Sequence, residues 1–322
     1  VLRKTKRPGL VELFSKSGLI VSSLGEEDIA FTLAPRINVA SRLADPMLAF
    51  ELLSTKDPSK AKALASELDK INNDRKKIVA NIMKEVKTIL KKRLENEDFV
   101  NSKFVVIGNP KWHVGVLGLI ASKILEEYKK TVFVWGGEDG EIRGSCRASG
   151  NVNLVSIMSS LPEGSLINFG GHKSAGGFSV LRDEIHFLEE RISNVFSEYS
   201  PEEDPSVFVD ASISIDDVTE DNYKTIQMLA PFGMANPRPI FELKNVQIIE
   251  IKEFGKEKNH LEITFENQRG KKIKAISFFK TREDFPSVKF EKDSKINLYD
   301  SFEKNNFGGR EELRLRIIDI LE

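Results

Sequence analysis

The clearest hydrophobic pattern in the chain is helical and runs from Ser59 to about Glu97. This stretch contains neither Gly nor Pro, and apolar residues recur in it at steps of three or four. The apolar positions are Leu64, Leu68, Ile71, Ile78, Ile82, Val86 and Leu90. We expect one long helix that acts as a rigid strut between domains. Its charged residues have mixed sign, so we interpret its polar face as solvated rather than as a nucleic-acid-binding surface.

The patterns on either side of this helix differ. Residues 10 to 55 alternate short helical patterns with turns, and Asp45 and Pro46 can start the last of these helices by capping it and fixing its first turn. After the long helix, two apolar strands flank a helical pattern, in the order "KFVVIGN", "GVLGLIASKILEEYKK" and "TVFVWGG". A strand, a crossover helix and a second strand predict a βαβ unit with parallel strands.

An α/β domain follows from the next segments. Asp139 and Gly140 predict a hairpin turn, and "IRGSCRAS" is the returning strand. Helices over about 152–161 and 182–197 flank a glycine-rich stretch, "NFGGHKSAGGFSV", and complete the domain. The segment "SPEEDPS" at 200–206 is a predicted linker.

The tail changes to short β-rich runs. These are "SVFVDASISI", "NVQIIEIKEF", "HLEITFEN", "KKIKAISFF", "KINLYDSFEK" and "ELRLRIIDIL". Such runs, separated by turn residues, favour a small closed or nearly closed β-barrel. The fold class is therefore multidomain α/β with a β-rich C-terminal domain.

Composition narrows the setting of the protein. A length of 322 residues predicts two or three domains, and a net charge of −1 means that any nucleic-acid surface must be a local basic face. The single Cys146 excludes an intrachain disulfide and a cysteine zinc site. The sequence has no run of eighteen apolar residues and no signal peptide, so we expect a cytoplasmic protein without a membrane partner. Because the sequence starts at Val1, we expect a fragment of a longer protein.

The strand "IRGSCRAS" carries the first candidate chemistry, because alternate side chains of a strand share a face. The polar face consists of Arg143, Ser145, Arg147 and Ser149. Two guanidinium groups and two hydroxyls are the donors that a phosphate needs. The alternative is an exposed strand edge protected by charge, and the pattern alone favours neither interpretation.

The glycine-rich stretch places His172 directly after Gly170 and Gly171 and shortly before Gly176 and Gly177. Glycine lets the backbone approach a ligand or adopt positive φ. An imidazole held there can donate to a phosphate or help position a scissile group, so His172 is the candidate catalytic residue. The alternative is a structural histidine in a turn, and the flanking glycines favour the functional interpretation.

Two further groups are candidate substrate-binding residues. His113 precedes the crossover helix, whose N-terminus favours an anion, although helix capping is the slightly preferred role. Arg36, Asn38 and Arg42 form a donor cluster near a turn and a helix start, where they either hold a phosphate backbone or tie down a loop.

Other side chains are not assigned to the site. We expect no role for His186, in an amphipathic helix, or for His260, in a loop. No Asp-x-Asp motif and no His-His pair suggests a metal site, so no metal ligand is assigned.

Taken in order, five segments resemble the second half of the RecJ family, bacterial single-stranded-DNA-specific exonucleases of the DHH phosphoesterase superfamily. They are "APRINVASR", "WHVGVLGLIAS", "RGSCRAS", "FGGHKSAGGF" and "PFGMANPRPIF". The glycine-histidine motif alone also occurs in the DHH-associated domains of small-oligonucleotide phosphodiesterases and of alanyl-tRNA synthetase. The order of the segments and the β-rich tail are more specific.

The resemblance implies four parts. Residues 1–57 would be the C-terminal remnant of a DHH domain, 58–98 the connector helix, 99–200 the DHH-associated domain, and 201–322 an OB-fold-like nucleic-acid-binding domain. The tail would stack bases on some of its aromatic residues, of which the candidates are Phe265, Phe279, Tyr299, Phe302 and Phe307.

The resemblance also implies roles for single residues. The strand with Ser145 and Arg147 would hold the phosphate end of the DNA, Asn38 and Arg42 would contact the strand near the scissile phosphate, and His172 would face the same cleft. His113 and Arg143 are weaker candidates. Two positions depart from the family: Ser41 replaces the frequent glycine of its "N-x-x-G-R" turn, and Ser174 replaces a frequent alanine. Both are small residues that keep the geometry.

The resemblance implies a metal-dependent 5′-to-3′ exodeoxyribonuclease of DNA repair and recombination, with Mn²⁺ or Mg²⁺ bound by residues that precede Val1. The present chain alone would then be inactive. Its ligand would be single-stranded DNA, with a single-strand-binding protein and a helicase as candidate partners. The alternatives are a catalytically inactive RecJ-related binding or scaffold protein and, less favoured because of the large β-rich tail, a phosphodiesterase for short oligonucleotides.

Overall fold

The structure is a computed structural model that describes residues 1–137, 141–199, 208–233, 235–255, 258–305 and 311–322. The predicted hairpin turn at 139–140, the predicted linker at 200–206 and the candidate aromatic Phe307 lie outside the described residues. The chain divides into two compact units, Val1–Pro205 and Ser206–Glu322.

The first part of unit 1 is helical. Its elements are η1 (Leu2–Lys4), α1 (Pro8–Ser17), η2 (Val21–Ser23), a π-helical segment η3 (Asp28–Leu33), α2 (Ala34–Leu43) and α3 (Met47–Ser54). These helices pack on the first half of α4 (Pro58–Arg93) around a core that includes Leu13, Leu52 and Leu68. The predicted start of α3 is confirmed, because the Asp45 carboxylate accepts from the Met47 N–H at 2.8 Å.

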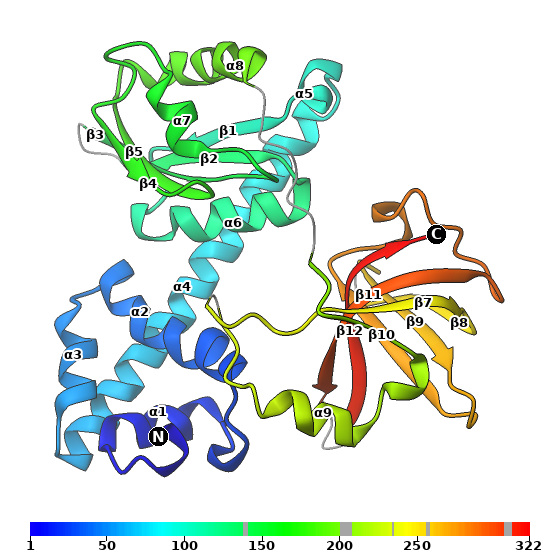
Figure 1. Ribbon diagram of the computed structural model, residues 1–322. Helices are drawn as coiled ribbons and strands as arrows, with labels where there is room; N and C mark the ends of the chain where they lie inside the picture. The colour runs from blue at the N-terminus through cyan, green and yellow to red at the C-terminus, as the bar shows by residue number, and fades with distance from the viewer. Residues whose placement is uncertain (138–140, 200–207, 234, 256–257, 306–310) are drawn as a thin grey trace. The chain divides into compact units, whose positions relative to one another are not determined.

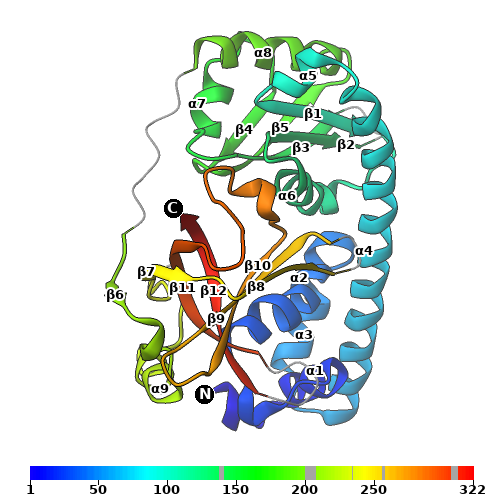
Figure 2. The ribbon, with the colours of Figure 1, turned by 90° about the vertical axis from the view of Figure 1, so that its right-hand side faces the viewer.

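The predicted long helix is confirmed as α4, which spans 36 residues and connects the helical part to the α/β part (Figures 1 and 2). Asp57 caps its N-terminus and Pro58 occupies its first turn. The helix ends at Arg93, earlier than the predicted Glu97, because Asn96 caps a separate short helix, α5 (Glu97–Asn101).

The α/β part of unit 1 is built on a five-stranded sheet in the order β1-β2-β3-β5-β4. The strands are β1 (Phe104–Asn109), β2 (Thr131–Gly136), β3 (Glu141–Arg147), β4 (Asn168–Gly171) and β5 (Ala175–Leu181). The predicted βαβ unit is confirmed: β1 and β2 are parallel, and η4 (Val114–Val116) and α6 (Leu117–Tyr128) connect them. β3 returns antiparallel to β2, as predicted.

Helices cover both faces of this sheet (Figure 1). On one face, α6 and the second half of α4 share a core with β1 and β2. On the other face lie α7 (Leu154–Ser159) and, after the short turn η5 (Ile185–Phe187), α8 (Leu188–Glu198). Both helices are shorter than predicted, because Asn153 caps α7 and a 3₁₀ turn containing His186 precedes α8.

Unit 2 contains a seven-stranded sheet in the order β6-β7-β11-β12-β10-β9-β8. The elements are β6 (Ala211–Ile213), η6 (Ile215–Asp217), α9 (Glu220–Gln227), β7 (Phe241–Gln247), β8 (Glu250–Phe254), β9 (His260–Glu266), β10 (Lys272–Phe278), η7 (Arg282–Asp284), β11 (Lys295–Asn305) and β12 (Glu312–Leu321). Strands β6 and β8 are the two edges, so among the described residues the strand pairing does not close a full circle. His260 is the first residue of β9, which corrects its predicted position in a loop.

Candidate phosphate-binding site

The polar face of β3 lies on the α6 side of the sheet. Ile142 and Cys146 point into the core beneath α7 and α8, so Arg143, Ser145 and Arg147 point to the opposite side, as the alternation predicts. Burial raises the pKa of the Cys146 thiol to about 12, which keeps it neutral and unreactive.

Ser149 and Arg143, two of the four residues of the predicted polar face, lie apart from the partly buried pair of Ser145 and Arg147. Ser149 lies beyond the end of β3, and its hydroxyl donates to the Lys129 carbonyl at 2.7 Å. Arg143 lies on the strand but is exposed, in register with Ser179 of β5. The tighter part of the site is therefore Ser145 and Arg147.

The Arg147 guanidinium is partly buried and held in one place. Its Nη1 donates to the Cys146 carbonyl at 2.7 Å and to Ser145 Oγ at 3.3 Å. Helix α6 passes close to it at Gly118, where an added Cβ would lie 3.1 Å from Arg147 Nη2 and 3.3 Å from Ser145 Oγ. Arg147 forms no ion pair with a described residue. Burial lowers the pKa of Arg147 most, Cys146 raises it, and repulsion from Arg42 lowers it further. An arginine nevertheless stays charged at ordinary pH.

Arg42 reaches this place from α2. Its Nη1 donates to the Gly115 carbonyl of η4 at 3.3 Å. Gly115 permits the contact, since a Cβ there would lie 2.0 Å from the Arg42 carbonyl oxygen. Helix α2 thus ends against the start of the crossover segment and brings Arg42 near Arg147.

The other residues of the α2 cluster have separate surroundings. The sequence "PRINVASR" lies inside α2, which starts at Ala34 as the predicted nearby helix start requires, but a π-helical segment and not a turn precedes it. Asn38 is exposed one turn before Arg42 and shares its helix face. Arg36 is committed within the fold: its Nε pairs with Asp69 of α4 at 2.8 Å, and its Nη1 donates to the Thr32 carbonyl.

His113 performs the capping role that its sequence position suggested. Its Nδ1 accepts from the Gly115 N–H at 3.1 Å, and the residue itself is exposed beside the start of η4. Its neighbour Trp112 is buried, and the Trp112 indole N–H donates to Glu85 of α4 at 2.9 Å. The capping bond fixes the imidazole against Gly115, whose carbonyl accepts from Arg42.

The glycine-rich stretch forms the hairpin of β4 and β5, with His172 exposed in its turn. Gly171 has φ +146°, and a Cβ there would lie 2.4 Å from the Ala175 carbonyl oxygen, so the turn requires glycine. The His172 N–H donates to that same carbonyl at 2.8 Å. Strand β4, which ends directly before His172, lies two strand spacings, about 10 Å, from β3.

A bare strip of sheet connects this hairpin to β3. Ser145 is in register with Gly177 of β5, and Gly177 is in register with Gly170 of β4. No described atom lies within 4 Å of the Cβ position of Gly170. Packing therefore does not require glycine at Gly170, and the sheet presents unobstructed backbone beside Ser145 and Arg147.

Sequence reasoning missed Arg75 on α4. The charges of this helix were interpreted as a solvated face, but Arg75 is only partly exposed. Burial, then repulsion from Arg42 and Arg36, lowers the pKa of Arg75. The available signal was its spacing, because Leu68, Ile71, Arg75 and Ile78 follow one another at steps of three or four.

Some of the aromatic residues that are candidates for base stacking in unit 2 are packed in its core instead. Phe265 and Phe302 are 1% and 2% exposed and belong to the core. The Tyr299 hydroxyl donates to Glu242 at 3.2 Å. Phe279 is 60% exposed, and its ring meets the edge of His260 at a centroid distance of 4.8 Å.

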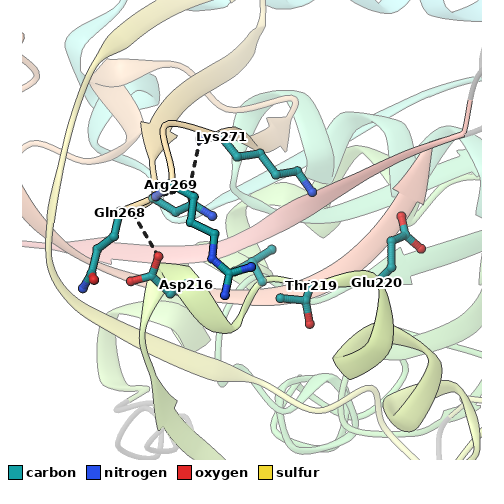
Figure 3. A pocket seen from close by; sticks show the side chains of 8 residues that line it. Asp216, Thr219, Glu220, Gln268, Arg269 and Lys271 are labelled. Atoms are coloured by element: carbon teal, nitrogen blue, oxygen red, sulfur yellow. Dashed lines mark hydrogen bonds between the residues drawn. The ribbon is translucent and has the colours of Figure 1, made fainter.

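A pocket of about 370 Å³ lies in unit 2, between the segment from η6 to α9 and the β9–β10 turn (Figure 3). Asp216 accepts from the Gln268 N–H at 2.9 Å across it. The lining includes Arg269 and Lys271 together with the carboxylates of Asp216 and Glu220. Its mixed charge distinguishes it from the cationic cluster of unit 1.

Within the described ranges, no three or more His, Cys, Asp or Glu side chains come together as a metal centre would require. The described residues therefore offer no ligand set for a metal ion. No described helix is long and apolar enough to cross a membrane.

The two units match two family models. Residues 100–198 match the DHHA1 domain, and residues 209–319 match the RecJ OB domain. These two matches define a protein that combines a DHH-associated domain with an OB domain. The chain belongs to the RecJ family and corresponds to the C-terminal portion of its members.

Known proteins are similar in sequence to most of this chain. The single-stranded-DNA-specific exonuclease RecJ of Bacillus subtilis is 29% identical over 322 residues, which cover 99% of this chain and 40% of the relative. RecJ of Escherichia coli is 29% identical over 73% of this chain and 42% of the relative. A crystal structure of RecJ in complex with Mg²⁺ from Thermus thermophilus has the same fold, with TM-score 0.75, 24% identity, and coverage of 100% of this chain and 47% of that one. The chain thus spans less than half the length of these relatives.

Proposed function

We propose that this chain is the DNA-holding portion of a single-stranded-DNA-specific 5′-to-3′ exonuclease that acts in cytoplasmic DNA repair and recombination. The observation that carries the proposal is the arrangement of Ser145, Arg147 and Arg42 beside a strip of bare glycine backbone. Guanidinium groups and hydroxyls donate to phosphate oxygens, and the missing side chains leave room for a nucleotide to approach. The names of the matched relatives support the substrate class.

Each candidate residue has a role in this proposal. Arg147 and Ser145 would bind the terminal phosphate, and Arg42 with Asn38 would bind the backbone near the scissile phosphate. His172 would donate to the same strand from the β4–β5 turn, with His113 and Arg143 at the margins of the site. Gly170 and Gly171 would allow the close approach. Arg36 would act indirectly, because its guanidinium is bonded to Asp69 and Thr32 and supports α2 from within.

In this proposal the catalytic metal ions are bound by residues outside this chain. Solved RecJ structures are described as complexes with Mg²⁺ or Mn²⁺. In the intact enzyme such ions would activate water for phosphodiester hydrolysis, held by residues outside this chain. The chain alone would position the strand and neutralise its charge. A single-strand-binding protein and a helicase would be partners of the intact enzyme, as the sequence resemblance implies.

Binding of labelled single-stranded DNA tests the proposal. We expect the chain to bind a 5′-phosphorylated oligonucleotide more tightly than its 5′-hydroxyl counterpart. Arg147→Ala should weaken binding about tenfold and reduce the magnitude of the salt slope by about 0.7, the value for one lost phosphate contact on a single strand. Arg7→Ala, an exposed arginine outside the site, is the matched control. Equal affinity and slope in the two variants would remove Arg147 from the site.

Activity is tested separately with the purified chain and Mn²⁺. We expect no degradation of a 5′-phosphorylated strand, because the described residues form no metal centre. Sustained Mn²⁺-dependent release of nucleotides that copurifies with the chain would contradict the assignment of the metal to other residues.

A further inference from the structure

Arg75 lies in the interior-facing row of α4 and pairs with no acidic side chain among the described residues. It lies between the apolar positions Ile71 and Ile78, and it is partly buried. Its Nε is buried and has no hydrogen-bond partner within the described part of the chain. A buried donor without a partner is unfavourable, so the fold alone does not explain why an arginine occupies this position.

The charged groups that act on the pKa of Arg75 are cations. Repulsion from Arg42 and Arg36 adds to burial in lowering its pKa. Repulsion from Arg42 also lowers the pKa of Arg147, and the Arg42 guanidinium donates to the Gly115 carbonyl at 3.3 Å. Of these four arginines, Arg36 has a carboxylate partner, Asp69 at 2.8 Å, among the described residues. The surplus of positive charge would be neutralised by a bound anion.

A second unpaired polar group lies one turn earlier on α4. Asn72 is 1% exposed, and neither its amide nitrogen nor its amide oxygen has a partner among the described residues. Asn72 and Arg75 are three residues apart and are therefore neighbours on the helix surface. Unused hydrogen-bonding capacity thus lies one turn from Arg75 on the same helix.

We propose that Arg75 is a further substrate-binding residue, through which the connector helix α4 binds a phosphodiester group of the DNA strand together with Arg42. This inference rests on the proposed function of the chain. The strand would then contact β3, α2 and α4 in turn, and Arg75 would hold the backbone next to the phosphate at Arg147. A guanidinium suits this role because its donors can engage two oxygens of one phosphate.

The test is titration of a 5′-phosphorylated oligothymidylate at several salt concentrations against the wild-type chain and four variants. We expect Arg75→Ala to weaken binding about tenfold and to reduce the salt slope by about 0.7. Arg75→Lys keeps the positive charge but not the paired donors of the guanidinium, so its affinity for DNA should lie between those of the wild type and Arg75→Ala. Lys76→Ala removes an exposed cation from the next position of the same helix and should stay within about twofold of the wild type. Arg147→Ala reports on the proposed function.

Thermal unfolding separates binding from structure. Because Arg75 is partly buried, has an unpaired Nε and is repelled by other arginines, Arg75→Ala should unfold at the same temperature as the wild type or a higher one. Added sulfate should raise the unfolding temperature of the wild type more than that of Arg75→Ala. If Arg75→Ala loses thermal stability and binds DNA like Lys76→Ala, Arg75 is structural and the inference is overturned.

The two proposals fail differently. If Arg147→Ala weakens binding while Arg75→Ala matches Lys76→Ala, the proposed function stands and the role of Arg75 is wrong. If the wild-type chain does not bind the oligonucleotide, the proposed function fails and this inference fails with it.

Discussion

Arg147 is held by its own strand before any ligand arrives. The Cys146 carbonyl and Ser145 Oγ accept from it, and Gly118 of α6 leaves just enough room for its guanidinium. A charged group fixed in this way loses little conformational freedom on binding a phosphate. The position of the Arg147 guanidinium therefore depends on Gly118, which has no side chain.

The first prediction concerns Gly118. A Cβ at this position would press on Arg147 Nη2 from 3.1 Å, so Gly118→Ala should displace the guanidinium. We expect single-stranded DNA affinity to fall about two- to tenfold, corresponding to an off-rotamer displacement. Fluorescence anisotropy measures the loss, with Lys123→Ala on the exposed side of α6 as the control. Wild-type affinity in Gly118→Ala would show that Arg147 adjusts freely or does not bind the strand.

The second prediction concerns Cys146. Its thiol is buried beside Met158, and burial raises its pKa to about 12, so the thiolate is scarce at neutral pH. We expect the native chain to resist a thiol-specific disulfide reagent at about pH 8 and to react with one equivalent once unfolded in guanidinium chloride. Rapid labelling of the native chain would contradict the burial of this residue.

At the scale of elements, β11 combines a regular strand with an irregular position. It pairs with β12 and β7, and its register with β12 shifts between Tyr299 and Asp300. Asp300 is fully buried at this irregularity, and neither carboxylate oxygen has a partner among the described residues. Burial raises the pKa of Asp300 well above its ordinary value.

The third prediction follows from the sign of this shift. A folded-state pKa above the unfolded value favours the fold at low pH, and the contribution is lost as pH rises through the folded pKa. Asp300→Asn should therefore raise the free energy of unfolding at about pH 7, because the amide cannot ionise, and each pKa unit by which the folded value exceeds the unfolded one corresponds to about 1.4 kcal/mol. The difference should shrink as pH falls towards about 4. Urea unfolding at several pH values measures it, with the exposed Asp221→Asn as the control. A gain that does not depend on pH would contradict the assignment.

At the scale of the whole molecule, the chain consists of two compact units with separate cores. Unit 1 carries the phosphate-binding candidates, and unit 2 matches the RecJ OB domain. Phosphate contacts in one unit and base stacking in the other would depend differently on the length of the DNA. Binding of long and short strands therefore tests the units separately.

The fourth prediction uses Phe279, the exposed ring beside His260 in unit 2. Loss of one base-stacking contact corresponds to about 1–3 kcal/mol, so Phe279→Ala should weaken binding of a long strand at least about fivefold. Binding of a short strand that occupies unit 1 alone should stay unchanged. Phe208→Ala, another exposed phenylalanine of unit 2, is the control. Equal loss for both strand lengths would remove Phe279 from a base-stacking role.

Much of the fold was predictable because local patterns carry it. The apolar spacing of α4, the alternation along β3 and the strand-helix-strand order of β1, α6 and β2 all follow from backbone periodicity. Errors arose at helix ends, where single caps such as Asn96 and Asn153 decide the boundary. Aromatic rings in the tail could not be sorted into core and surface, because that depends on which strands pair.

The sequence by itself determined the elements and the donor types: a long helix, a polar strand face and glycine turns follow from periodicity and from the steric limits of each residue. Only the tertiary structure decided which donors lie together. It brought Arg42 against Gly115, placed Arg75 among other arginines and paired Arg36 with Asp69. These contacts join residues of different elements, and packing between elements, rather than any local pattern, sets their distances and burial.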